Sequence, residues 1–311
     1  MRANALRMAP LSVLMMHMSA IAEIVDFSGP PDSLPHERYI NAVSEDRSPV
    51  IETYVKSTDG VYVAAAIRKP SGRGPFPAIV MFHGAPGGRG MEQLLGWSRG
   101  DHGGPVWERF LQEGFVVAVA DYRGGDFDIV NAPSDTGVTT AIDDGIAVVE
   151  HVSALPYVDD EQISIYGVSL GGNLALFLAS KIQTLKAVVA GAPAPFWFLG
   201  VRDRPERGAA DAAPLRFDAS VAAENIEPIR TPILIQVGTA DPLLEIDRVL
   251  HEQFALQSKA VRLEIYEHGY HDFVLGPQGH VRRDLPQGEI LLQGTLDALE
   301  RSLAFVKSGR L

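Results

Sequence analysis

The sequence predicts an α/β fold whose mostly parallel sheet starts with antiparallel strands and carries helices on both faces. Short apolar runs alternate with segments of helical periodicity along most of the chain, an order that is typical of parallel sheets covered on both sides. The stretch IETYVKSTDGVYVAAAIRKP contains two strand-like runs joined at an Asp-Gly pair, which indicates a hairpin. For a chain of 311 residues, a single α/β domain is the simplest prediction.

The elements after the hairpin follow a regular order. The strand-like and helical segments are FPAIVMFHG, VWERFLQEG, FVVAVADYR, TTAIDDGIAVVEHVSAL, QISIYGVS, LALFLASKI, LKAVVAGAP, PILIQVGTAD, EIDRVLHEQFALQS and VRLEIYEHG, with a last helix near residues 288–306. Two stretches, residues 87–104 and 193–231, interrupt the order and are long for loops of a compact domain. Both follow strand ends, where ligands of open α/β sheets bind. We predict that they cover a binding site, with 193–231 as a small lid; surface loops or short extra helices are the alternative.

Residues 1–50 form a separate N-terminal segment, which we expect to be helical or extended. Within residues 1–22, Arg2 and Arg7 precede an apolar stretch, and this is the outline of a secretory signal peptide. However, His17 interrupts the apolar stretch, and its apolar residues recur at helical spacing. We therefore favour a retained packing helix and a cytoplasmic location, with export through a signal peptide as the alternative. No stretch reaches the roughly 18 to 20 uninterrupted apolar residues of a membrane span.

Composition narrows the classes of partner. Acidic residues number 39 against 27 Lys and Arg, which gives a net charge of −12, and no basic cluster is present that would favour nucleic acid. The chain contains no cysteine, so disulfides, thiolate nucleophiles and zinc-thiolate sites are excluded. We expect a small-molecule ligand and neither a cofactor nor a metal. The sequence leaves the oligomeric state open, a homodimer included.

The hexapeptide GVSLGG, residues 167–172, lies between the apolar run QISIY and the helix-like stretch NLALFLASKI. It contains the pattern G-x-S-x-G in a strand-to-helix context, which is the setting of a nucleophilic serine. Such a serine has strained backbone angles that only small neighbours two residues away accommodate, and Gly167 and Gly171 occupy those positions around Ser169. A glycine-rich turn needed only for packing is the alternative.

A serine nucleophile requires a base and an orienting carboxylate, in the chain order Ser, Asp or Glu, His for sheets of this kind. Asp241 follows the apolar run ILIQVGTA, although a turn or capping role is the alternative. His268 and His271 both follow the next strand-like run. We favour His271 as the base, because it lies farther past the strand end, and we expect His268 to be structural.

Two backbone amides would bind the oxyanion of the reaction. Leu170 follows the serine and begins the helix, so its amide is the first predicted donor. The second should come from the loop after FPAIVMFHG, where we select Ala85 because Pro86 has no N–H. We expect His83 to anchor that loop from the strand end.

Other polar residues near strand ends have ordinary structural explanations. Asp121 and Arg123, in DYRGGDFD, could line a pocket, but such residues more often brace loops. Asp143 and Asp144 lie on a helix, where we expect them to be solvated. The aromatic cluster of Phe196, Trp197 and Phe198 falls in the predicted lid and forms either a substrate pocket or a packing contact.

Together, FHGAPGG, ADYRGG, YGVSLGG, RTPILIQVGTADPLL and YEHGYHDF resemble the α/β-hydrolase superfamily. The resemblance is to the branch of dienelactone-hydrolase-like esterases and the catalytic domains of prolyl-oligopeptidase-type peptidases. It covers residues 51–275 and implies one α/β-hydrolase catalytic domain over residues 51–311. It also implies a Ser169, Asp241 and His271 triad, with Phe273 at the aromatic position two residues after the base. The HGAP loop is nearer the His-Gly-Gly-Pro of the peptidase branch than the His-Gly-Gly-Gly of other esterases.

Three functions follow as hypotheses. The first is a serine carboxylic-ester hydrolase that acts on a small or medium ester through an acyl-enzyme. The second is a serine peptidase or amidase with the same triad; the region before residue 51 is too short for the propeller of the oligopeptidases, which favours the esterase. The third is a hydrolase-fold binding protein without turnover. The fold hosts many activities, so the substrate class rests on the resemblance.

Overall fold

The computed structural model describes residues 37–41, 49–85, 87–98, 104–124, 135–201, 216–275 and 288–311. The predicted signal peptide or packing helix over residues 1–22 therefore lies outside the described residues. The segment before residue 51 contributes the short strand β1 (Glu37–Asn41) and the first two residues of the next strand, with which β1 pairs. Among the described helices, none combines the length and apolar character that crossing a membrane requires.

In the described part of the chain, nine strands form one sheet in the order β1-β2-β3-β5-β4-β6-β7-β8-β9. The pairs β1/β2, β2/β3 and β3/β5 are antiparallel, and all later neighbours are parallel. This confirms the predicted mostly parallel sheet with an antiparallel start. The strands are β2 (Pro49–Lys56), β3 (Tyr62–Arg68), β4 (Phe76–Phe82), β5 (Val116–Ala120), β6 (Val158–Val168), β7 (Ala187–Gly191), β8 (Ile233–Gly238) and β9 (Val261–Tyr266).

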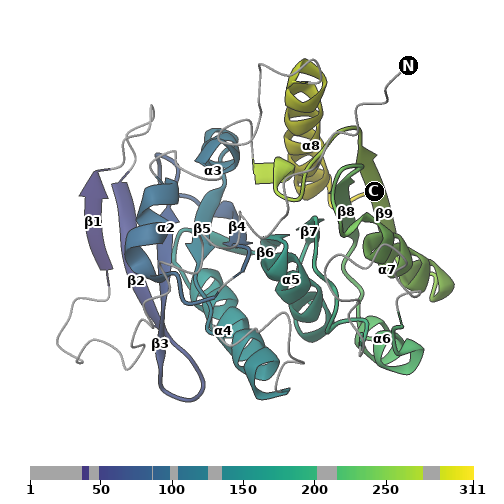
Figure 1. The fold of residues 1–311 in the computed structure, drawn as a ribbon. Helices are drawn as coiled ribbons and strands as arrows, with labels where there is room; N and C mark the ends of the chain where they lie inside the picture. Colours follow the sequence, from purple (N-terminus) through teal and green to yellow (C-terminus); the bar gives the residue numbers. More distant parts are fainter. Residues whose placement is uncertain are drawn as a thin grey trace.

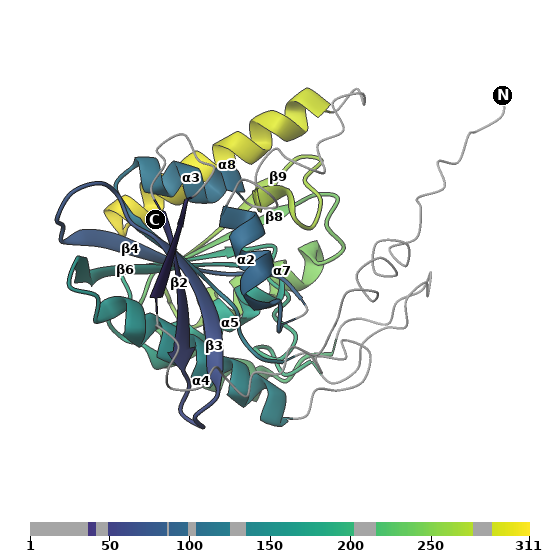
Figure 2. The same ribbon diagram turned by 90° about the vertical axis from the view of Figure 1, so that its left-hand side faces the viewer.

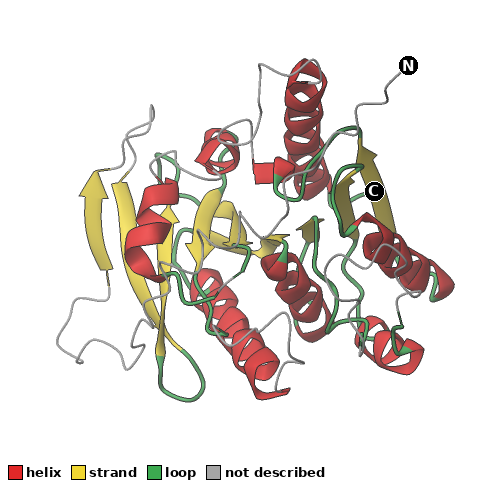
Figure 3. Ribbon diagram, viewed as in Figure 1, coloured by secondary structure: helices red, strands yellow, loops and turns green. Residues whose placement is uncertain are grey.

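Helices cover both faces of the sheet. In Figure 1, α3 and α8 lie above the strands and α4 and α5 lie below them, and Figure 3 shows the same view with helices in red and strands in yellow. The helices are α2 (Gly90–Ser98), α3 (Gly104–Gln112), α4 (Asp135–Ser153), α5 (Leu170–Lys181), α6 (Ala219–Ile226), α7 (Leu244–Leu256), the short 3-10 helix η1 (Phe273–Leu275) and α8 (Gly288–Ser308). The turned view in Figure 2 shows the same two layers from the β1 side.

Two apolar cores lie between the sheet and its helices, one on each face. One core joins the sheet to α4, α5, α6 and α7, and the other joins it to α2, α3 and α8. Because strand side chains alternate between faces, each central strand supplies both cores, as β4 does with Val80 in one and Ile79 in the other. Helix α5 is buried along almost its whole length, so the element that follows Ser169 is held firmly.

The two stretches that interrupt the predicted order contain helices. Residues 90–98 form α2, whose Met91 and Leu94 are buried in the second core, so this part of 87–104 is a packed helix. The stretch 193–231 contains α6, with Ala222 and Ile226 buried, and residues 202–215 lie outside the described part. A substrate-covering role for either stretch stays a prediction.

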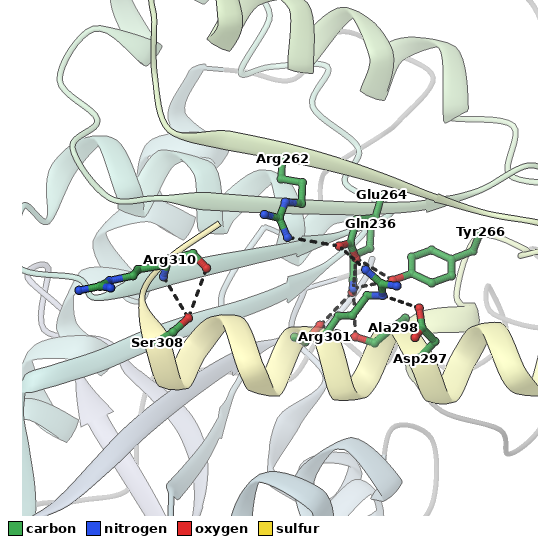
Figure 4. Close-up of polar contacts among 10 residues, drawn as sticks. Gln236, Arg262, Glu264, Tyr266, Asp297, Ala298, Arg301, Ser308 and Arg310 are labelled. Atoms are coloured by element: carbon green, nitrogen blue, oxygen red, sulfur yellow. Dashed lines mark hydrogen bonds and ion pairs between the residues drawn. The ribbon is translucent and has the colours of Figure 1, made fainter.

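A polar network fastens the last helix to the last two strands (Figure 4). Gln236 Nε2 on β8 donates to the carbonyl of Ala298 at 3.0 Å, and the Tyr266 hydroxyl on β9 donates to Glu264 at 2.7 Å. Arg301 on α8 pairs with Glu264 at 3.5 Å. The strands that precede Asp241 and His271 are thus fixed from the side of α8 as well as within the sheet.

Candidate functional site

Ser169 lies on a sharp turn between β6 and α5, with φ 55° and ψ −119°. This left-handed backbone is strained for a residue with a side chain. The flanking glycines are sterically required: a Cβ on Gly167 would lie 2.1 Å from the carbonyl oxygen of Gly171, and one on Gly171 would lie 2.2 Å from that of Phe82. The requirement for small residues at these two positions therefore has a direct steric basis.

The side chains of Ser169, His271 and Asp241 lie in one hydrogen-bonded row. His271 Nε2 is 2.8 Å from Ser169 Oγ, and His271 Nδ1 is 3.0 and 3.2 Å from the two carboxyl oxygens of Asp241. The Asp241 side chain is fully buried, whereas that of His271 is 36% exposed. Nδ1 of His271 thus faces a buried carboxylate, Nε2 contacts the serine hydroxyl, and the ring itself is partly exposed.

Backbone contacts between two loops bring the acid and the histidine together. Gly238 ends β8, and a Cβ there would lie 1.9 Å from the carbonyl oxygen of Gly269; that same carbonyl accepts the amide of Ala240 at 3.0 Å. Asp241 Oδ1 also accepts the amide of Leu243 at 2.8 Å. The loop after β8 therefore packs on the loop after β9 with backbone against backbone.

The structure separates the two candidate histidines. His268 has φ 60°, and its side chain, 41% exposed, lies 3.6 Å from Glu267 rather than at the serine. Its amide donates to Thr239 Oγ1 at 2.8 Å, so its backbone helps to join the two loops. The histidine placed at Ser169 is His271.

The segments that carry the two predicted oxyanion donors lie near the serine. Leu170 begins α5, and the first amides of a helix have no acceptor within it. Ala85 lies in the loop after β4, next to Gly84, where a Cβ would lie 3.2 Å from the Cβ of Ser169. The loop thus passes close to the serine, whereas Pro86 lies outside the described residues.

A buried carboxylate organises that loop. Asp121, fully buried after β5, accepts the amides of Gly88 at 3.0 Å and Gly90 at 2.7 Å. It also contacts Nε2 of His83 at 3.0 Å. The carbonyl of Ala85 accepts a hydrogen bond from Arg89 at 2.6 Å. The structure confirms the expected bracing by Asp121 and anchoring by His83.

The prediction that Asp144 is solvated is wrong. Asp144 is fully buried and accepts hydrogen bonds from the amide of Arg123 at 2.9 Å and from its guanidinium at 2.6 Å. Arg123 also pairs with Asp59 at 2.6 Å, so it braces the loop after β5 against the first hairpin. Asp144 shares the helical spacing of Ala141, Val148 and Val152, which are buried, and this was the available signal.

The aromatic cluster divides between core and partly open positions. Phe198 is fully buried, with its ring 5.1 Å from that of Phe177 and 6.2 Å from that of Phe254. Phe196 and Trp197 are half-buried. These placements favour packing for Phe198 and leave Phe196 and Trp197 as the candidates for a substrate pocket.

Sequence reasoning missed a buried acid on α7. Asp247 is fully buried, and neither of its carboxyl oxygens has a hydrogen-bond partner among the described residues. Burial, with a further contribution from the charge of Asp241, raises the pKa of Asp247 well above its ordinary value. Asp247 precedes Leu250 and Phe254 at helical spacing on the buried face, which was the signal for it.

Solved structures establish the fold class. The hyperthermophilic esterase of the archaeon Pyrobaculum calidifontis superposes with a TM-score of 0.59 at 19% sequence identity, over 86% of this chain and 88% of that chain. With the sheet order described above, this likeness shows that the protein has the α/β-hydrolase fold. The family follows from the sequence: the model of the dienelactone hydrolase family matches residues 63–282. The chain therefore belongs to the dienelactone hydrolase family.

Two curated proteins are similar to part of the chain. The quorum-quenching protein AidA of Acinetobacter baumannii (strain MDR-ZJ06) is 29% identical over 138 residues, which cover 44% of this chain and 41% of that protein. The peroxisomal succinyl-coenzyme A thioesterase of Mus musculus is 28% identical over 155 residues, which cover 50% of this chain and 31% of that protein. The similarity thus extends over less than half of either relative.

Proposed function

We propose that the protein is a serine carboxylic-ester hydrolase that acts on small or medium esters through an acyl-enzyme. The observation that carries the proposal is the row of Ser169, His271 and Asp241, in which one imidazole contacts both the serine hydroxyl at 2.8 Å and the buried carboxylate at 3.0 Å. A serine hydroxyl becomes a nucleophile when a positioned base removes its proton. The three side chains supply the nucleophile, the base and the group that orients the base.

The proposed reaction has two halves. His271 Nε2 takes the proton of Ser169 Oγ as the oxygen attacks the ester carbonyl, and the oxyanion is held by the amides of Leu170 and Ala85. His271 then gives that proton to the leaving alcohol, and the acyl group stays on Ser169. In the second half His271 deprotonates a water molecule, which attacks the acyl-enzyme. His271 then returns the proton to Ser169 Oγ as the acid is released. Asp241 stabilises the imidazolium in both halves.

The strained turn supports the role of Ser169. Its positive φ is maintained by glycine contacts that no side chain could replace, and strain of this kind persists where the surrounding structure enforces it. The turn also places Ser169 at the N-terminus of α5, whose dipole favours a developing negative charge. Phe196 and Trp197, half-buried, are the proposed contacts for the acyl or alcohol part of the substrate.

Hydrolysis of p-nitrophenyl esters of increasing chain length tests the proposal. The wild type should hydrolyse the short esters, and Ser169→Ala should reduce the rate to the background. A fluorophosphonate probe should label the wild type and leave Ser169→Ala unlabelled. If the wild type shows neither turnover nor labelling, the protein is a binding protein and the proposal fails.

The bond that is cleaved is tested by matched substrates. Amides and thioesters with the acyl group of the best ester belong in the same series, because a peptidase uses the same three residue types and one relative is named as a thioesterase. The expected result is a kcat/KM that is highest for the oxygen ester. Turnover of amides without turnover of esters would identify a peptidase or amidase.

A further inference from the structure

Strand β9 forms one edge of the sheet. It lies at the right-hand side of the sheet in Figure 1, and among the described residues β8 is the one strand that pairs with it. The pairing with β8 is regular over all six residues from Val261 to Tyr266, and β9 contains neither a proline nor a bulge that would block a further strand. An edge of this kind is a template for another strand.

The backbone groups of β9 divide between its two sides. The carbonyls of Ala260 and Tyr266 accept amides from β8 and from the residue after it, at 2.9 and 2.8 Å. The even-numbered residues of β9 therefore direct their backbone groups toward β8. Because this direction alternates along a strand, the N–H and C=O groups of Val261, Leu263 and Ile265 point to the outer edge.

The two charged side chains of β9 lie on one face of the strand. Arg262 and Glu264 both point toward the side of α8 (Figure 4). The Arg262 side chain is 49% exposed and reaches Glu264 of its own strand only at 3.9 Å. Glu264 is 12% exposed and lies 3.5 Å from Arg301, which also pairs with Asp297 at 2.5 Å. Arg262 is therefore the cation of this group that has room for a second carboxylate.

The other face of β9 carries a row of apolar side chains. Val261 and Leu263 are partly buried against the core that α7 helps to form. Ile265 belongs to the same row by the alternation of the strand, and it is 37% exposed. A strand added at the outer edge would extend this apolar row and cover Ile265.

One antiparallel register between two β9 strands matches both faces. With Leu263 opposite Leu263 of a second copy, the outward backbone groups of Val261, Leu263 and Ile265 meet as hydrogen-bonded pairs. Arg262 then lies opposite Glu264 of the second copy, twice by symmetry. On the other face, Val261 lies opposite Ile265. Opposite charges and apolar side chains that face one another across two strands stabilise their pairing.

Other registers lose this match. A shift by two residues sets Arg262 opposite Arg262 of the second copy, or Glu264 opposite Glu264, and like charges directly opposite each other destabilise a strand pair. A shift by one residue sets outward backbone groups against groups that are already bonded to β8. The sequence VRLEIY therefore favours a single register of self-pairing.

We propose that two copies of the protein associate through their β9 strands, antiparallel and with Leu263 on the two-fold axis, so that one sheet runs through both copies. Such an interface uses the same surface on each copy and closes on itself, as in most homodimers. The pairing covers both open edges and so prevents further strands from adding there. The proposal concerns assembly and does not depend on the proposed function.

Sedimentation velocity of the full chain measures the association. The wild type should sediment as a dimer at micromolar concentration. Arg262→Glu should raise the dissociation constant about tenfold or more, because a glutamate would face Glu264 at two symmetric positions. Lys181→Glu is the matched control, because Lys181 is exposed at the end of α5, which packs on β6 and β7; this variant should stay dimeric. A monomeric wild type, or an equal effect of the two variants, would overturn the proposal.

Single cysteines test the register, since the chain contains no cysteine of its own. In the proposed dimer the two Leu263 Cα atoms lie about 5.5 Å apart, which is within disulfide range, so Leu263→Cys should form a covalent dimer under mild oxidation. The two Ile265 positions lie roughly 13 Å apart along the strands. Ile265→Cys should therefore remain unlinked, although Ile265 is the more exposed residue. Linkage through Ile265→Cys instead, or through neither variant, would overturn the proposed pairing.

Discussion

Ser169 Oγ lies 2.8 Å from Nε2 of His271 although 102 residues separate them in the sequence. The parallel sheet accounts for this, because β6 and β9 end at the same edge and the turns that follow them converge there. The geometry of the row therefore depends on strand register and on the two turns.

Asp241→Asn should lower kcat by roughly 10⁴-fold while the fold is retained, because an amide favours the wrong tautomer of His271 and cannot stabilise its cation. Steady-state kinetics with a short p-nitrophenyl ester, together with circular dichroism, measures both quantities. A kcat close to that of the wild type would remove Asp241 from the mechanism.

Gly171→Ala should disrupt the turn at Ser169, because the new Cβ would lie 2.2 Å from the Phe82 carbonyl oxygen and backbone atoms cannot move aside cheaply. Both the melting temperature and kcat should fall. Gly294→Ala is the matched control, since its Cβ meets Tyr266 at an ordinary 3.7 Å and alanine favours the helix by up to about 1 kcal/mol. Equal behaviour of the two variants would contradict the steric argument.

Trp197→Ala and Phe198→Ala should have different effects. Phe198 is fully buried between two other rings, so its truncation should cost about 3 to 5 kcal/mol of unfolding free energy. Trp197 is half-buried, and its truncation should change the preferred ester chain length with a smaller loss of stability. An unchanged chain-length profile in Trp197→Ala would assign Trp197 to packing.

Asp247→Asn should stabilise the protein at neutral and alkaline pH. The ordinary pKa of an aspartate is 3.8, and burial raises that of Asp247 well above it in the folded state. Between these two values the folded state binds a proton that the unfolded state has released, so stability falls as the pH rises, by about 1.4 kcal/mol per pH unit. Below the lower value this pH dependence disappears.

Urea unfolding of wild type and variant across the pH range measures this effect. The advantage of Asp247→Asn should be small in acid and grow as the pH rises above 3.8. Asp144→Asn supplies the contrast, because Asp144 is a buried carboxylate paired with Arg123, and its loss should destabilise the protein. A constant difference between Asp247→Asn and wild type at every pH would show that Asp247 titrates normally.

Much of the fold could be predicted because its signals are local. The Asp-Gly turn near Gly60 predicts the hairpin of β2 and β3, and apolar runs bounded by turn residues predict the parallel strands. The GVSLGG motif places Ser169 because steric demands restrict which residues flank it. Asp241 and His271 follow from the chain order of strand ends, which is a property of the sheet.

The remaining features depend on neighbours that are distant in sequence. Asp144 is polar by residue type, and its burial depends on an ion pair with Arg123, which lies in the loop after β5. Helix α2 lies in a stretch where a short helix is the alternative to the predicted cover over a binding site. Its apolar face packs on β2, β3 and β5, and these strands are not adjacent to it in the sequence. The anchoring of His83, which follows β4, depends on Asp121, which follows β5, and no single stretch of sequence contains both.

The backbone contact between Gly238 and Gly269 restricts which loops around the site can change in length. Because no side chain lies between these two glycines, the loops that carry Asp241 and His271 pack directly on each other. A change in the length of one loop would therefore require a matching change in the other. The segment that contains Phe196 and Trp197 follows β7 and lies outside this contact. A substitution in this segment can therefore change the proposed substrate contacts and leave the positions of Asp241 and His271 unaltered.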